Sequence, residues 1–202
     1  EAVSDASRRE IVRRYYQAMC DLRTGRGEES AVAKIELLMN KAEITVDINP
    51  TVAASLRKAE ETGMPAVAIE LPDGQVITGK TSSLLGASSA ALLNALKVLA
   101  GLDDSLHLIA PEVIEPIQHL KISHLGNHNP RLHTDETLIA LSISAVTDPN
   151  AERAMEHLAE LSGCDAHSTV ILSQVDTDVF RKLGVNMSCE PRYQTKKLYH
   201  KR

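Results

Sequence analysis

The chain has 202 residues, a net charge of −5 at pH 7 and only 2% aromatic residues. The negative charge and the scarcity of rings on which bases could stack argue against a nucleic-acid partner. No apolar run approaches the roughly 20 residues of a membrane span, and no signal peptide is visible. The sparse cysteines Cys20, Cys164 and Cys189 show no disulfide framework, which favours a reducing compartment such as the cytoplasm.

Residues 1–64 are expected to form a helical segment that packs on an α/β domain of residues 65–202. A first helix is expected to follow a Ser4 cap. A second helix is expected further along the chain, where apolar side chains recur at helical spacing. Asn49 is a candidate cap for a later helix with proline in its first turn, and Gly63 is expected to end that helix. The sequence begins with a glutamate, which we interpret as a fragment cut from a longer protein.

Residues 65–80, PAVAIELPDGQVITGK, are typical of two strands joined by an Asp-Gly turn. The stretch from Gly74 to Thr81 also matches the phosphate-loop pattern G-x-x-x-x-G-K-T. A phosphate loop needs a coiled backbone, whereas the Gln-Val-Ile-Thr between the glycines favours extended backbone, so we interpret it as a strand. Lys80 and Thr81 leave this strand near a helix start and could help to bind a carboxylate or phosphate. Ordinary serine capping and a surface lysine are the alternative explanation, which the sequence favours.

The remaining sequence predicts alternating helices and strands. Helices are expected at residues 88–101, 111–120, 148–163 and 176–184, and strands at residues 105–110, 137–146, 168–173 and 185–190. Pro116 is expected to limit its helix. The last part has the order β-α-β-α-β, which implies neighbouring parallel strands. The predicted fold class is therefore α/β: a helical N-terminal segment, a hairpin and a layered sheet with mostly parallel strands.

Residues 123–136, SHLGNHNPRLHTDE, are rich in histidine, asparagine and charge. Gly126 and the Asn129-Pro130 step make a helix improbable here, because the residue before proline is pushed out of the helical region. Arg131 offers a planar fork for phosphate or carboxylate, and the asparagines can bind a ligand or cap their own backbone. A polar loop, a ligand pocket and a metal site are the open alternatives, although the spacing matches no strong zinc signature. The candidate ligand-binding residues are Lys80, Thr81, His124, Asn127, Asn129, Arg131 and His133.

A second candidate segment is residues 163–169, GCDAHST. Cys164 and His167 could be a nucleophile and its base, two metal ligands, or a small buried cysteine near an unrelated histidine. His128 and His167 are the candidate general acid/base residues, because histidine titrates near neutral pH. Both candidate segments precede a predicted strand, so we expect them to share one edge of the sheet, at the amino ends of the strands, and to form one pocket.

Several stretches together resemble the C-terminal part of a bacterial family catalogued as domain of unknown function number eighteen forty-six. They are residues 8–22, 31–40, 70–80, 111–145 and 163–173, in matching order and spacing. Full chains of the family begin with an α/β domain that carries a glycine-rich, nucleotide-type loop, so the resemblance implies an upstream domain as a partner. Some members are labelled ATP-dependent zinc proteases. This chain has no H-E-x-x-H motif, and the resemblance assigns no catalytic residue.

We therefore expect the C-terminal α/β half of an uncharacterised, soluble bacterial enzyme that binds a small anionic or nucleotide-like ligand. Arg131 and Lys80 would neutralise the charge of that ligand. One alternative is a structural domain without chemistry of its own that forms homo-oligomers. The other is a zinc-dependent hydrolase with Cys164, His167, His124 and His128 as metal ligands. The sequence specifies neither the reaction nor a cofactor.

Overall fold

The structure is a computed structural model that describes residues 2–194. Its α-helices are α1 (Ala2–Arg23), α2 (Glu29–Lys41), α3 (Pro50–Thr62), α4 (Ala87–Leu99), α5 (Pro111–His119), α6 (Thr134–Ser144), α7 (Pro149–Glu156) and α8 (Gln174–Lys182). Shorter helical turns are η1 (Val46–Ile48), the π-helical η2 (Leu120–His124) and η3 (Leu158–Leu161). The strands are β1 (Ala66–Glu70), β2 (Val76–Lys80), β3 (Asp165–Ser168) and β4 (Asn186–Cys189).

The sheet is mixed, with the strand order β2-β1-β3-β4. Strand β1 pairs antiparallel with both β2 and β3, and β3 pairs parallel with β4. Within the register, Ile69 of β1 lies opposite Ile77 on one side and Ala166 on the other. Strands β2, β3 and β4 therefore run in one direction, and their carboxyl ends meet at one edge of the sheet beside the start of β1.

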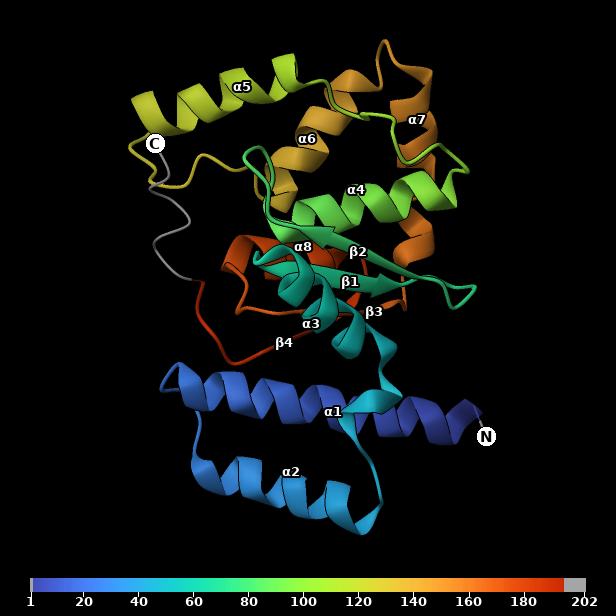
Figure 1. Cartoon of the computed structure of the whole chain (residues 1–202), viewed down its shortest axis with the longest axis vertical. Coiled ribbons are helices and arrows are strands. Elements are labelled where there is room, and N and C mark those ends of the chain that lie inside the picture. The colour runs from blue at the N-terminus through green and yellow to red at the C-terminus, as the bar shows by residue number, and fades with distance from the viewer. Residues whose placement is uncertain (1, 195–202) are drawn as a thin grey trace.

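Helices cover both faces of this sheet (Figure 1). The upper layer contains α4 to α8, and the lower side is closed by α1 and α2, with α3 lying across the strands. Successive side chains of β3 point alternately toward the two helical layers, as the two-residue period of a strand requires. Ala166 belongs to the apolar core under α4 and α8, whereas Asp165 and His167 face α1.

Gly79 explains why helix α4 can lie directly on strand β2. A Cβ atom placed at Gly79 would lie 2.1 Å from the backbone nitrogen of Ala91 in α4, which no side chain could avoid. The glycine of the Gly-Lys-Thr sequence is thus required for close helix–strand packing, and the residues before it are extended in β2. The interpretation as a hairpin strand is confirmed, and the phosphate-loop pattern is coincidental.

Other expectations also agree with the structure. Helix α3 begins at its Asn49 cap, whose Oδ1 accepts a hydrogen bond from the Thr51 nitrogen at 3.1 Å, and it ends at Gly63 in the left-handed conformation with φ of 64°. Helices α4 and α8 and strand β4 lie close to their predicted positions. Local capping and turn chemistry fix these elements, which is why the sequence predicts them well.

The predicted strand at residues 137–146 is wrong, because this segment is helix α6. Its apolar residues lie on all sides of the helix, and a short apolar run of this kind carries no periodicity that separates a strand from a helix. The predicted strand at residues 105–110 is also not formed; Leu108 and Ile109 enter the core from an irregular segment. The sheet is therefore mixed rather than mostly parallel.

Three boundaries also differ from expectation. Strand β3 precedes the predicted strand at residues 168–173 and shares only Ser168 with it. Pro116 lies inside α5 and does not end it, since the helix runs on into η2. Ser4 lies within α1 rather than capping it.

None of the helices within residues 2–194 is long and apolar enough to cross a membrane.

Replacing Gly79 by alanine should destabilise the protein strongly, because the added methyl group must push α4 away from β2. Overpacking of this kind costs about 1–3 kcal/mol, and sometimes more. Urea unfolding measures the change. Gly86→Ala is the matched control, since Gly86 has an ordinary extended conformation and its nearest neighbour for a new Cβ is 3.7 Å away. Equal unfolding free energies for the two variants would contradict the proposed packing role.

Candidate functional site

A cavity of about 320 Å³ opens at the sheet edge where β2 and β3 end. Thr81 lines it directly after β2, and residues 170–173 line it after β3. The start of α4 and residues 129–133 complete much of its wall. Crevices at the carboxyl ends of strands are the usual ligand sites of open α/β sheets. We call this space the anion cavity.

Leu132 fixes the histidine-rich loop to the start of α4. Its backbone nitrogen donates to the Leu84 oxygen at 3.0 Å. Its own oxygen accepts hydrogen bonds from the Gly86 nitrogen at 3.3 Å and the Ser89 hydroxyl at 3.1 Å. Two of these contacts join backbone to backbone and the third comes from the Ser89 hydroxyl, and together they hold the loop at a set distance from the first turn of α4.

Lys121 also holds the loop of residues 129–133 in place. Its side chain comes from η2, is only 3% exposed, and donates from Nζ to the Arg131 oxygen at 2.6 Å and to Glu136 Oε2 at 2.7 Å. A buried ammonium group needs such partners, since an unpaired charge in the interior is very costly. The lysine therefore ties the loop to the first turn of α6.

The first turn of α4 faces the anion cavity without a side-chain cap from any residue that the structure describes. Its leading N–H groups have no carbonyl four residues before them in the helix, and they form the positive end of the helix dipole. The neighbouring helices differ. Asp176 Oδ1 accepts from the Thr134 nitrogen at the start of α6, and Ser173 caps α8. The open helix start at this cavity is that of α4.

Two buried hydroxyl groups line the anion cavity. Thr81 and Ser88 are each 3% exposed, and neither side chain makes a hydrogen bond to any residue in the described part of the chain. Their hydroxyl oxygens are not among the fully enclosed polar atoms that lack a partner within the described residues, so they are accessible from the cavity. Their position on the wall means that a molecule inside the cavity could accept these hydrogen bonds.

Arg131 brings a permanent positive charge to the cavity wall. Its Nε donates to the Ser82 oxygen, which anchors the guanidinium group across the loop. The backbone nitrogen of Arg131 donates to Asn129 Oδ1 at 3.1 Å. Asn129 thus caps its own loop, as one of the two alternatives for the asparagines predicts.

His133 and Asp176 form an ordered pair beside the cavity. His133 Nδ1 lies 3.2 Å from Asp176 Oδ2, and this hydrogen bond raises the pKa of His133 above its usual value despite partial burial. Burial acts to raise the pKa of Asp176, but hydrogen bonds from His133 and Thr134 outweigh it and hold that pKa below its usual range. A proton on Nδ1 is donated to the carboxylate, which leaves the other ring nitrogen for a ligand.

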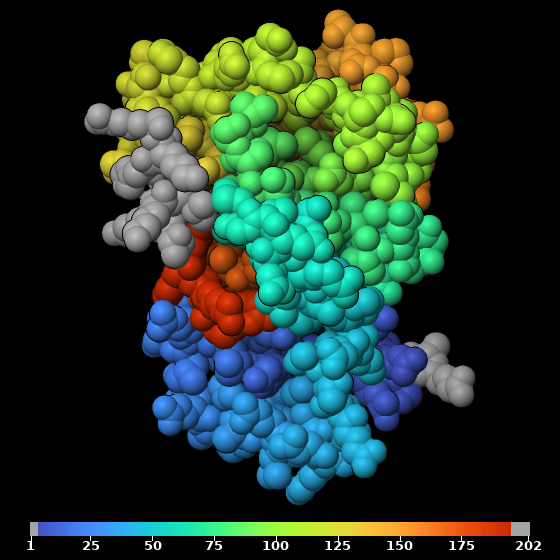
Figure 2. Space-filling model, in the orientation of Figure 1, coloured from blue at the N-terminus to red at the C-terminus, as the bar shows by residue number. Residues whose placement is uncertain are grey.

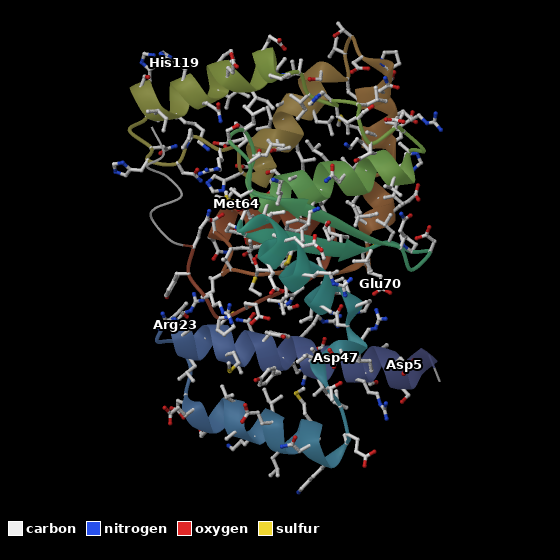
Figure 3. The ribbon with its side chains drawn as sticks, in the orientation of Figure 1. Asp5, Arg23, Asp47, Met64, Glu70 and His119 are labelled. Atoms are coloured by element: carbon white, nitrogen blue, oxygen red, sulfur yellow. The ribbon has the colours of Figure 1, made fainter. Side chains whose placement is uncertain are left out.

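The other predicted ligand-binding residues lie elsewhere on the surface. His124, Asn127, His128 and Lys80 are all exposed and do not belong to the wall of the anion cavity. His124 contacts His119 edge to face, with the ring centroids 5.4 Å apart, and His119 lies on α5, far from α1 (Figure 3). Of the predicted set, Thr81, Asn129, Arg131 and His133 line the cavity.

Cys164 and His167 do not form a pair, because they occupy opposite faces of the sheet. Cys164 belongs to the apolar core, and burial raises the pKa of its thiol, which opposes thiolate formation. His167 is fully buried on the α1 side, where Nδ1 lies 2.8 Å from Ser188 Oγ and Nε2 lies 3.1 Å from Glu190 Oε1. Both ring nitrogens are thus occupied by the protein.

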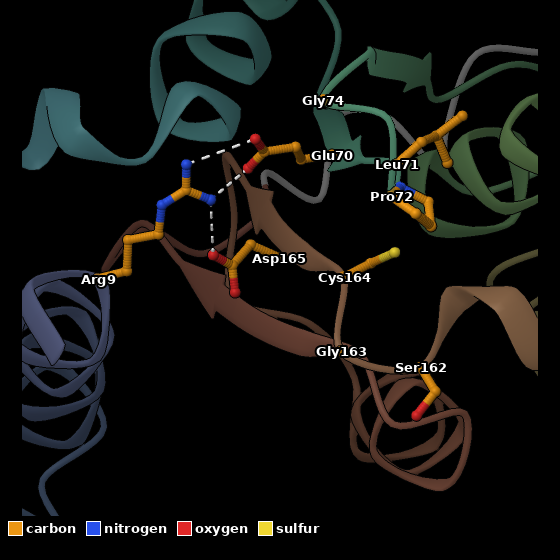
Figure 4. A pocket seen from close by; sticks show the side chains of 9 residues that line it. All are labelled: Arg9, Glu70, Leu71, Pro72, Gly74, Ser162, Gly163, Cys164 and Asp165. Carbon is orange, nitrogen blue, oxygen red and sulfur yellow. Dashed lines mark hydrogen bonds and ion pairs between the residues drawn. The ribbon is translucent and has the colours of Figure 1, made fainter. Parts of the chain in front are cut away.

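The expectation that the two candidate segments share one sheet edge is also wrong. Cys164 lies at the amino end of β3, beside a different cavity whose wall includes Arg9, Glu70 and Asp165 (Figure 4). Its side chain points away from that charged group. The error follows from residues 137–146, whose assignment as a strand placed the histidine-rich loop at the amino side.

The four residues proposed as zinc ligands are not brought together. Cys164 and His167 face different layers, and His124 and His128 are exposed, with His124 against His119 of α5. Within the described residues, no three His, Cys, Asp or Glu side chains are grouped so that they could hold a metal ion.

Asp176 is the site residue that the sequence interpretation did not find. Ser173 and Asp176 have the spacing of a helix-capping pair, and each indeed bonds to the other at the start of α8. That local signal predicts a helix start but not the contact with His133, which lies 43 residues away. Only the tertiary fold shows that this carboxylate orients an imidazole.

Comparison with known proteins identifies the family. Residues 47–199 match the family model described as "Domain of unknown function DUF1846, C-terminal", and residues 1–43 match "Domain of unknown function DUF1846, N-terminal". The chain belongs to this family. The resemblance inferred from the sequence is thereby confirmed, and the family models divide the chain between α2 and η1.

Two curated streptococcal relatives illustrate the similarity. The UPF0371 protein SpyM50764 of Streptococcus pyogenes serotype M5 and the UPF0371 protein stu1377 of Streptococcus thermophilus are each 54% identical over 201 residues. The match covers 100% of this chain and 41% of each relative. The chain therefore spans about two fifths of the length of these proteins.

Replacing Asp176 by asparagine should lower the pKa of His133, because the carboxylate that stabilises the imidazolium is lost while the shape of the side chain is kept. An NMR titration of the imidazole signals measures the pKa. Asp178→Asn, on the exposed side of the same helix, is the matched control and should leave the His133 pKa unchanged. An unaltered His133 titration in the Asp176 variant would show that the pair is not electrostatically coupled.

Proposed function

We propose that this chain binds a small anionic ligand, with a phosphate or carboxylate group, in the anion cavity. The proposal rests on several groups that line the same cavity. They are the uncapped start of α4, Arg131 and two unpartnered hydroxyls. Its volume of about 320 Å³ is in the range of small-molecule sites. Helix N-termini with a nearby arginine are well suited to phosphate.

The balance of charge at the cavity supports an anion over a cation. Asp176 is the acidic residue on the wall, and its carboxylate already accepts hydrogen bonds from Thr134, Ser173 and His133. The raised pKa of His133 keeps a positive charge there to higher pH than usual for histidine. Arg131 and the positive end of the α4 dipole add further positive charge at the cavity.

If the bound ligand is also a substrate, His133 is the general acid/base that this proposal favours. It lies on the cavity wall, and a buried carboxylate orients it, which is the arrangement used in known proton-transfer sites. The sequence-based candidates His128, His167 and Cys164 lie outside this cavity. An acid/base role for His133 is compatible with a hydrolase and with other reactions of phosphate or carboxylate esters.

A structural role in assembly is the second candidate. Helix α6 exposes Ile139 and Ile143, and Val146, two residues past the end of α6, is 81% exposed. Apolar residues at this spacing on one helix face are typical of a surface that contacts another chain or domain, including the upstream domain of longer relatives. A purely structural chain would bind no anion in the cavity, so anion titration separates the two proposals.

Replacing Arg131 by glutamine should weaken binding of inorganic phosphate by about tenfold or more, because a charge-assisted hydrogen bond contributes about 1.5–3 kcal/mol. Isothermal titration calorimetry measures the affinity. Lys80→Gln is the matched control, since Lys80 is exposed and outside the cavity wall, and it should bind phosphate like the parent. Equal affinities for the parent and the Arg131 variant, or no phosphate binding by the parent, would refute the proposed site.

Anion affinity should fall as the pH rises through the raised pKa of His133. The imidazolium attracts the anion below that pKa, and the neutral ring does not above it. Asp176 from α8 and Glu136 from α6 raise this pKa, and Lys121 from η2 lowers it. Sulfate is the suitable probe, because its charge is constant over this range. The affinity of His133→Asn for sulfate should be independent of pH; a pH-independent affinity in the parent would contradict the role of His133.

A further inference from the structure

A second cavity, of about 550 Å³, adjoins the anion cavity. The two share the wall residues Pro65, Val170, Tyr193 and Gln194. The second cavity lies between α3 and the segment that follows β4, and the surface is hollowed there between the cyan and red regions of Figure 2. We call it the ring subsite, for the reason developed below.

The two cavities differ in chemistry. The ring subsite combines apolar wall residues, Leu56, Ala59, Pro65 and Val170, with the ring of Tyr193. Its charged wall residues are Glu60 and Arg192, which have opposite signs. The ring subsite is therefore close to neutral, whereas the anion cavity is positive. A ligand that fits both would have one anionic end and one uncharged end.

Tyr193 makes the neutral end suitable for a flat ring. Aromatic residues are only 2% of this chain, yet Tyr193 stands at the junction of the two cavities and is 54% exposed. The Arg23 guanidinium lies 5.4 Å from the centroid of its ring, a cation–π contact that restrains the ring. An exposed, restrained aromatic ring is a platform on which a heterocycle can stack.

Building on the proposed function, we infer that the ligand is a phosphate monoester with a flat heterocycle, of the size of a nucleoside monophosphate. Its phosphate lies at the start of α4 beside Arg131, and its ring lies against Tyr193 in the ring subsite. Leu56 and Ala59 of α3 contribute the apolar side of that subsite. Thr169, Glu60 and Gln194 offer hydrogen-bond partners for ring or sugar groups.

The charge pattern favours one phosphate over a polyphosphate chain. The open helix start and Arg131 lie in the anion cavity, whereas Glu60 and Arg192 give the ring subsite opposite charges, so only one end of the ligand meets a positive surface. The direction of the ligand is set as well. With the phosphate at the α4 N-terminus, the rest of the molecule extends past Pro65 and Val170 at the carboxyl end of β3.

The test compares inorganic phosphate, ribose 5-phosphate and the four common nucleoside monophosphates by calorimetry on the 202-residue chain. At least one nucleotide should bind ten or more times more tightly than ribose 5-phosphate. Leu56→Gln, which lies outside the anion cavity, should remove this advantage and leave the affinity for inorganic phosphate unchanged, and Tyr193→Ala should also remove the advantage. Tyr193→Phe, which keeps the ring, should retain it. Thermal unfolding of each variant verifies that it is folded.

The outcomes separate this inference from the function on which it rests. If phosphate binds and no nucleotide binds more tightly than ribose 5-phosphate, the ring subsite is refuted and the anion site stands. A nucleotide advantage that survives in both folded variants would also overturn the assignment of the ring subsite. If neither phosphate nor any nucleotide binds to the parent chain, the proposed anion site itself is refuted.

Discussion

The hydrogen bonds of Leu132 join two parts of the chain that are more than forty residues apart, and the candidate site depends on them. They hold the loop of residues 129–133 against the connection between β2 and α4. Together with the hydrogen bond from Arg131 Nε to the Ser82 oxygen, this contact fixes Arg131 relative to the first turn of α4. Lys121 strengthens it from the buried side through the Arg131 carbonyl. A loop held by backbone bonds and a buried ion pair can present its side chains to a ligand with little loss of entropy on binding.

The opposite edge of the sheet shows what distinguishes the site. There, Arg9 of α1 binds both Glu70 and Asp165 (Figure 4). Arg13 of α1 also binds Asp165, so that two positive groups meet these two carboxylates. The nearby cavity has about the same volume as the anion cavity, but its charges are already matched by partners within the chain. This ion-pair cluster attaches α1 to the sheet. At the carboxyl edge, Arg131 and His133 line a cavity whose wall includes one acidic residue, Asp176.

Local chemistry determined which parts of the fold could be predicted. The Asp-Gly hairpin, the Asn49 cap and the Gly63 helix end are signals contained within a few residues, and the structure agrees with them. Helix α6 was misassigned because its apolar residues surround the helix, and the sheet edge of the loop was misassigned as a result. Turn chemistry predicts a loop within residues 123–136, and the part of it at residues 129–133 lines the anion cavity. The Asp176–His133 contact was beyond the sequence, because it depends on how α8 docks against α6.

The most direct test of the account is an amide NMR titration of the chain with inorganic phosphate. We expect the largest shift changes at the backbone N–H groups of Ala87 and Ser88, with smaller ones at Arg131 and His133. Cys164 and Asp165 at the opposite edge should not respond. Shift changes centred on that opposite edge, or none at any residue at millimolar phosphate, would contradict the central claim that the start of α4 and the loop of residues 129–133 form an anion site.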